Sequence, residues 1–118
     1  MATRLSPVLN RIDSTLDDAV ARLLDLLAIP SISTDPAYKA DCARAADWLV
    51  ADLATLGVKA ETIATPGHPM VMGHVDGPEG QDTPHLVFYG HYDVQPVDPL
   101  SLWNNDPFAP AVEATAKG

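Results

Sequence analysis

The sequence predicts an α/β fold in which helices pack on a central β-sheet. Two long segments with a helical spacing of apolar residues come first, and three shorter apolar runs follow them. The last run, residues 86–89, is apolar on both faces, which is typical of a central strand covered by helices. A chain of 118 residues is long enough for one small domain with a hydrophobic core.

The two helices are expected at residues 12–28 and 36–56, where apolar side chains recur every three to four positions. Pro30 ends the first of them, because the residue before a proline disfavours the helical conformation. Pro36 suits the first turn of the second helix. Gly57 suits the position just after its end, where the backbone often adopts a positive φ angle.

Three strands are expected after the helices. Residues 58–64 and 70–75 are short runs with imperfect alternation, bounded by loops that contain proline and glycine. Residues 85–89 form the third and most apolar run, and residues 86–89 are expected at the centre of the sheet. The order of helix, helix, strand, strand, strand favours the α/β class.

The composition excludes several classes of function. Sixteen acidic residues against seven basic ones give a net charge of −9, so we expect no binding to nucleic acid or to an anionic membrane surface. Cys42 is the single cysteine, which excludes an internal disulfide and a cysteine zinc cluster. We expect it to be a small buried hydrophobe. No stretch approaches the length of a membrane span, so a cytoplasmic protein is expected.

The candidate functional residues are His91 and Asp93, which follow the most apolar of the three runs. Side chains two positions apart on a strand point the same way, and α/β sheets form ligand sites at the carboxyl ends of strands. A metal-bound imidazole usually donates its other N–H group to a carboxylate, carbonyl or water. The spacing leaves open whether Asp93 orients His91 itself or holds another group nearby.

The sequence contains a second pair with the same spacing, His74 and Asp76, also preceded by a glycine. This pair runs directly into a glycine-proline turn, which favours an exposed hairpin end. The apolar run before His91 and the Val-Gln-Pro-Val segment after Asp93 distinguish the candidate pair. His68, between a glycine and a proline, is expected to be solvated in a loop, and His85 to be an exposed edge residue.

Three motifs carry a resemblance to a known family. Residues 90–96, Gly-His-Tyr-Asp-Val-Gln-Pro, resemble the first metal-binding motif of M20 metallopeptidases, in particular the dipeptidase branch with the carnosinase-like enzymes. Residues 103–108, Trp-Asn-Asn-Asp-Pro-Phe, resemble the run that follows that motif. Residues 26–33, Leu-Leu-Ala-Ile-Pro-Ser-Ile-Ser, resemble the opening helix and its turn. The similarity extends over the chain from Ile12 on, and three motifs in order are far more specific than a histidine and an aspartate alone.

The resemblance implies an M20-type metallopeptidase that hydrolyses dipeptides or short peptides at a two-metal site. The metals are usually zinc, although other divalent ions are possible, and they activate a water and polarise the scissile carbonyl. By resemblance His91 is a metal ligand, and Asp93 is the catalytic residue that supports the site beside it. The base glutamate and the other ligands are expected beyond Gly118.

Residues 1–118 are therefore expected to be the N-terminal part of a single catalytic domain, inactive alone, with a possible homodimer formed through other regions. One alternative within the superfamily is an N-acyl amino acid deacylase or carboxypeptidase, although Tyr92 and Gln95 favour the dipeptidase branch. An alternative of another class is a non-catalytic protein-interaction module with the same fold. The presence of the later carboxylates in a longer sequence discriminates these hypotheses.

Overall fold

The computed structural model describes residues 5–80 and 82–114, which group into two compact units. One unit contains the described residues up to Ala28 together with those from Ser101 on, and the other is Ile29–Leu100. Among the described residues, no helix combines the length and the apolar character that crossing a membrane requires. The candidate site lies in the second unit.

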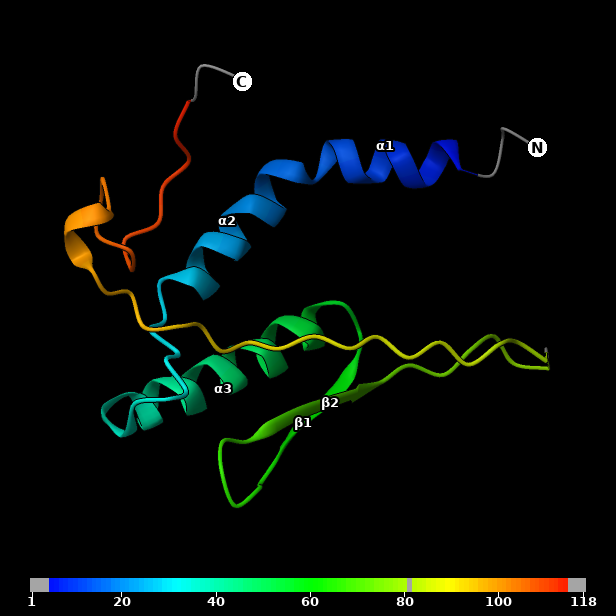
Figure 1. Ribbon diagram of the computed structural model, residues 1–118. Helices are drawn as coiled ribbons and strands as arrows, with labels where there is room; N and C mark the ends of the chain where they lie inside the picture. Colours follow the sequence, from blue (N-terminus) through cyan, green and yellow to red (C-terminus); the bar gives the residue numbers. More distant parts are fainter. Residues whose placement is uncertain (1–4, 81, 115–118) are drawn as a thin grey trace. The chain divides into compact units, whose positions relative to one another are not determined.

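The first unit contains two helices, α1 (Ser6–Ser14) and α2 (Leu16–Leu27), where the sequence predicted one helix over residues 12–28. The axis changes direction at Thr15 (Figure 1). The hydroxyls of Ser14 and Thr15 both donate to the Arg11 carbonyl, at 3.0 and 2.8 Å. Such hydroxyl bonds to a backbone carbonyl compete with the helical ladder and bend helices, which explains the break.

The second unit begins its main helix where the sequence predicted it. A single 3₁₀ turn, η2 (Pro36–Tyr38), leads into α3 (Lys39–Thr55). The carboxylate of Asp35 caps this start by accepting a hydrogen bond from the backbone N–H of Ala37 at 2.9 Å.

The end of α3 confirms the predicted role of Gly57, whose φ angle is +77°. Its N–H donates to the Ala54 carbonyl at 3.0 Å, and the Val58 N–H donates to the Leu53 carbonyl at 3.1 Å. This pair of bonds satisfies two carbonyls at the helix end, as in a Schellman motif. The chain then reverses direction and enters the first strand.

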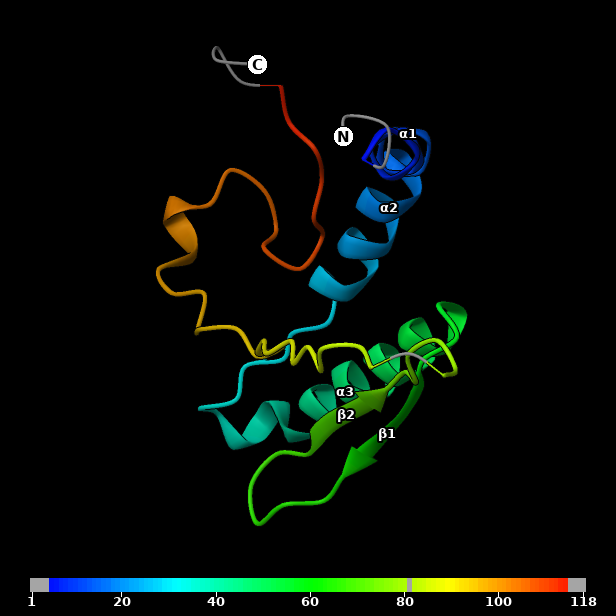
Figure 2. The same cartoon turned by 90° about the vertical axis from the view of Figure 1, so that its right-hand side faces the viewer.

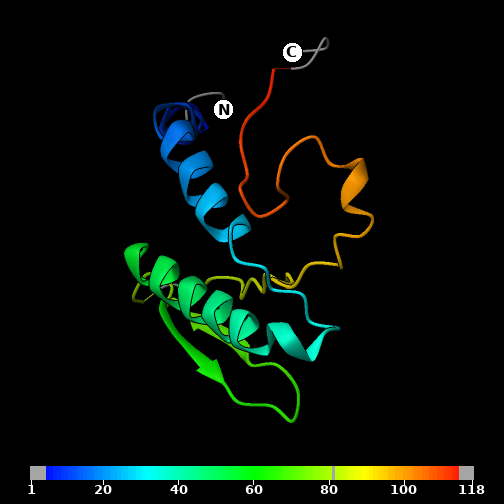
Figure 3. The same ribbon diagram turned by 90° about the vertical axis from the view of Figure 1, so that its left-hand side faces the viewer.

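The strands β1 (Lys59–Ile63) and β2 (Met70–His74) form an antiparallel hairpin, close to the two ranges expected from the sequence. Helix α3 packs on this hairpin (Figures 2 and 3). The packing is close because the buried residues of α3 are small, and Cys42 is fully buried as predicted. Gly73 is required for the same reason, since a Cβ there would lie 2.8 Å from Cγ1 of Val58.

The predicted central strand does not form, and this expectation is wrong for the described structure. Residues 86–89 are extended without a ladder partner (Figure 1). Their side chains are exposed, from 75% for Leu86 to 92% for Tyr89. A run that is apolar on both faces needs a neighbouring strand and a covering layer on each face. Within the described residues the sheet has only β1 and β2, and α3 packs on it.

The exposed run should make the 118-residue chain self-associate, because contiguous exposed apolar surface promotes association. Replacing Phe88, which is 90% exposed, by lysine should reduce that association. Val112→Lys is the matched control, since Val112 is also exposed but lies outside the run. Sedimentation velocity over a concentration series measures the effect. A compact monomer at every concentration for the unmodified chain would contradict the expectation.

Candidate metal-binding site

The segment that carries the candidate residues is held against the turn after α2. Ile32 and Val94 form a parallel bridge, and the Val94 N–H donates to the Ser31 carbonyl at 3.0 Å. The Ser31 hydroxyl donates to the Tyr92 carbonyl at 2.8 Å, and Ser31 is only 2% exposed. These bonds fix the backbone on both sides of Asp93.

Asp93 binds the ring of His91 directly, which answers the question that the spacing left open. Nδ1 of His91 lies 2.9 Å from Oδ1 of Asp93 and 3.1 Å from the Asp93 carbonyl oxygen. Both partners are acceptors, so Nδ1 carries the proton and donates it. The lone pair of Nε2 is thereby left available to a metal ion.

The second carboxylate oxygen of Asp93 is also bound. The Ser33 hydroxyl donates to Oδ2 at 2.6 Å. This hydrogen bond is the largest cause that lowers the pKa of Asp93. Burial acts in the opposite direction and comes second, and the hydrogen bond and charge of His91 lower the pKa further. The carboxylate is therefore ionised at neutral pH and accepts from both neighbours.

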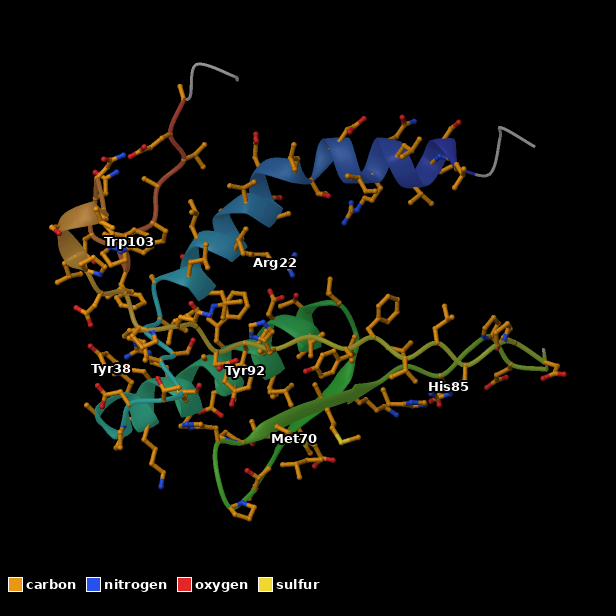
Figure 4. The ribbon with its side chains drawn as sticks, in the orientation of Figure 1. Arg22, Tyr38, Met70, His85, Tyr92 and Trp103 are labelled. Atoms are coloured by element: carbon orange, nitrogen blue, oxygen red, sulfur yellow. The ribbon has the colours of Figure 1, made fainter. Side chains whose placement is uncertain are left out.

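Two more side chains, those of Tyr92 and His68, form hydrogen bonds to backbone carbonyls near the His91–Asp93 pair. The Tyr92 hydroxyl donates to the Pro69 carbonyl at 2.5 Å (Figure 4), and the pKa of this phenol is raised, chiefly by burial and then by Cys42 and Asp93. His68 donates from Nε2 to the Ser33 carbonyl at 2.8 Å. It is half-buried, and its Nδ1 is buried without a partner among the described residues. The expectation that His68 is solvated is therefore wrong.

The second histidine–aspartate pair differs in geometry as well as in place. His74 uses Nε2, not Nδ1, to contact Oδ1 of Asp76 at 3.0 Å. Its side chain is 61% exposed and that of Asp76 81%, as expected for a hairpin end. The ring of His74 stacks on that of His85 with centroids 6.0 Å apart, and His85 is exposed as predicted, although outside any strand.

The described residues fit one ligand position and not a complete metal site. His91 presents a free nitrogen on a side chain that is 74% exposed. Among residues 5–80 and 82–114, no three His, Cys, Asp or Glu side chains come together to hold a metal ion. A catalytic zinc requires three protein ligands. Cys42 supplies no donor, because it is buried and burial raises the pKa of its thiol.

The sequence prediction named His91 and Asp93 but not the residues that hold them in the structure. Ser31, Ser33 and His68 lie more than twenty positions away along the chain, and no local spacing connects them to the pair. The one signal in the sequence was the Ile-Pro-Ser-Ile-Ser turn, which resembles the same turn in the family but to which the sequence analysis gave no function. Its two serines are the residues that bind the Tyr92–Asp93 segment.

Comparison with known proteins agrees with the predicted resemblance. No protein-family model matches the chain. It is 29% identical to the Cys-Gly metallodipeptidase Dug1 of Schizosaccharomyces pombe, over 96% of this chain and 25% of that protein. The corresponding protein of Candida albicans is 29% identical over 88% of this chain and 24% of its own length. A succinyl-diaminopimelate desuccinylase of Burkholderia cenocepacia is 44% identical over 59 residues, which are 50% of this chain and 16% of that protein.

Comparison with solved structures also finds a Dug1 protein. The solved structure of the di-peptidase Dug1p from Saccharomyces cerevisiae superposes with a TM-score of 0.82 at 24% identity, over 96% of this chain and 26% of that one. The chain therefore shares the fold of the part of that structure that it matches. It spans about a quarter of the length of the Dug1 relatives that it matches.

The lowered pKa of Asp93 predicts a pH-dependent contribution to stability in the metal-free protein. A carboxylate whose pKa falls below its ordinary value of 3.8 stabilises the folded state above that pH, and the contribution is lost as the pH falls through the lowered pKa. Asp93→Asn should therefore unfold more easily than the unmodified protein at about pH 5, with a difference that shrinks towards about pH 2.

The difference in unfolding free energy should stay below about 1 kcal/mol, because solvent screens the carboxylate of Asp93, whose side chain is 43% exposed. Urea unfolding across this pH range measures it. Asp76→Asn is the control, since an exposed pair contributes little and its removal should change the unfolding free energy little at any of these pH values. An equal effect of the two variants would contradict the assignment.

Proposed function

We propose that this chain is the N-terminal part of the catalytic domain of an M20-type metallopeptidase that hydrolyses dipeptides. The observation that carries the proposal is the His91–Asp93 hydrogen bond, which leaves Nε2 of His91 free within the motif at residues 90–96. The similarity of almost the whole chain to two Cys-Gly metallodipeptidases supports it. A dipeptide such as Cys-Gly is the proposed substrate.

In this proposal His91 binds one of two divalent metal ions, of which zinc is the first candidate, through Nε2. When bound, the metals lower the pKa of a water molecule and polarise the scissile carbonyl. Asp93 keeps the proton of His91 on Nδ1 and makes Nε2 a better electron donor. The general base and the remaining ligands come from residues outside those described, because the described residues hold no cluster of three donors.

The test is a comparison of the two histidines in the full-length protein. His91→Ala should reduce bound metal and abolish hydrolysis of Cys-Gly, because a ligand is lost. His74 has the same local spacing, and His74→Ala should leave metal content and turnover nearly unchanged, because the His74–Asp76 pair lies exposed at the end of the hairpin. Metal analysis of the purified variants and a turnover assay give both readouts. Metal loss in His74→Ala but not in His91→Ala would reverse the assignment.

Asp93→Ala addresses the supporting role separately. Removing the acceptor at Nδ1 should lower metal affinity or activity by roughly 10- to 100-fold, as for other carboxylates that orient metal-bound histidines. Zinc titration of the metal-free protein and turnover at saturating zinc separate weakened binding from a slower reaction. Unchanged affinity and turnover would exclude Asp93 from the site.

A second activity is favoured by one specific observation, the 44% identity to a succinyl-diaminopimelate desuccinylase over half of the chain. That reaction also cleaves an amide bond, so the same metal chemistry serves it. Turnover of Cys-Gly and of N-succinyl-diaminopimelate by the same preparation discriminates the two substrates. Hydrolysis of neither, together with no bound metal, would favour the non-catalytic interaction module instead.

A further inference from the structure

We propose that Ser33 is a positioning residue for the metal ligand, acting through Asp93 on the ring of His91. This proposal rests on the proposed function for its metal-binding consequence, although its structural core concerns the metal-free protein. The Ser33 hydroxyl and the His91 ring occupy opposite oxygens of one carboxylate, at 2.6 and 2.9 Å. The three side chains therefore form a continuous chain of hydrogen bonds.

The carboxylate needs this second anchor because it is not enclosed. The side chain of Asp93 is 43% exposed and that of His91 74%, so water competes for every polar atom of the pair. A carboxylate bound only by a mobile, exposed ring can rotate about its terminal torsion, which has a broad energy profile. The hydroxyl of Ser33 fixes Oδ2 from the protein side, and this leaves Oδ1 directed at Nδ1.

Ser33 can serve as an anchor because its own backbone is held. Its carbonyl accepts a hydrogen bond from Nε2 of His68 at 2.8 Å. The residue before it, Ile32, is 3% exposed and forms the parallel bridge to Val94. The hydroxyl is therefore presented by a buried, hydrogen-bonded turn, sixty positions from Asp93 in the sequence.

The His74–Asp76 pair shows what the same spacing does without such an anchor. Among the described residues the carboxylate of Asp76 contacts only His74, and it does so at Nε2. That arrangement engages the nitrogen that His91 leaves free. A ring nitrogen that contacts a carboxylate carries the proton, which places the proton on Nδ1 in His91 and on Nε2 in His74, so the two pairs favour opposite tautomers. The Ser33 hydroxyl is the contact that distinguishes the two carboxylates.

The first experiment reads the tautomer directly. In the metal-free full-length protein, the ¹⁵N chemical shifts of the imidazoles should place the proton of His91 on Nδ1. Ser33→Ala should shift His91 towards a mixture of tautomers, while His74 keeps its own spectrum. An unchanged His91 tautomer in Ser33→Ala would overturn the proposal, and this readout is valid whether or not the protein proves to be a peptidase.

The second experiment measures zinc affinity by competition with a chelator. Ser33→Ala should bind zinc about 10-fold more weakly, the lower end of the range for residues that orient metal-bound histidines. Ser33→Thr keeps the hydroxyl and should restore the affinity, whereas Ser33→Val has nearly the same shape without the hydroxyl and should not. The threonine–valine pair keeps the hydroxyl test independent of any folding defect in the alanine variant.

Ser31→Ala separates positioning from simple support of the turn. Ser31 donates to the Tyr92 carbonyl from the same turn but does not touch Asp93. Its loss should lower thermal stability and leave the His91 tautomer in place. Equal tautomer changes in Ser31→Ala and Ser33→Ala would show that the turn as a whole is responsible and would overturn the specific role of Ser33. Failure of the unmodified protein to bind zinc would instead refute the proposed function.

Discussion

Hydrogen bonds between the turn at residues 29–33 and the segment at residues 91–94 are the constraint on which the site depends. Ser31 binds the Tyr92 carbonyl, and Ser33 binds the Asp93 carboxylate. The segment has no strand partner in the sheet of β1 and β2, so these bonds replace the ladder that would otherwise fix its direction. Buried polar groups that are fully paired specify one arrangement, because each lost partner leaves a desolvation cost.

The parts of the fold that the sequence predicted correctly have local causes. A proline and an aspartate start the 3₁₀ turn that leads into α3, and Gly57 follows the end of α3 with a backbone conformation that other residues rarely adopt. The break at Thr15 is local too, but a helical stripe of apolar residues does not report hydroxyls that bind a carbonyl one turn back. The run at residues 86–89 was misjudged because a strand depends on distant partners, and its apolar character shows only what it could pair with.

The candidate site, like the fold, was predictable only where its causes are local in the sequence. Spacing alone did not separate the pair at His91 from the pair at His74, and the observed difference lies in which ring nitrogen each carboxylate engages. In our proposal that choice depends on Ser33, sixty positions upstream, which no pattern within the motif contains. The resemblance to a family marked the serine turn and the motif together, whereas physical reasoning on one stretch of chain found only the motif.

The exposure of His91 and the exposure of residues 86–89 have a common consequence under the proposed function. An exposed apolar run requires neighbouring strands to cover it, and a metal ligand requires further donors beside it. Residues 86–89 and His91 lie in one continuous segment, so both requirements apply to the same part of the chain. Parallel strands that paired with this run would end at the same edge of the sheet as His91, where α/β folds place their ligands. Under the proposed function, completing the sheet would also assemble the donors, so metal binding and folding of this region would be coupled and each would stabilise the other.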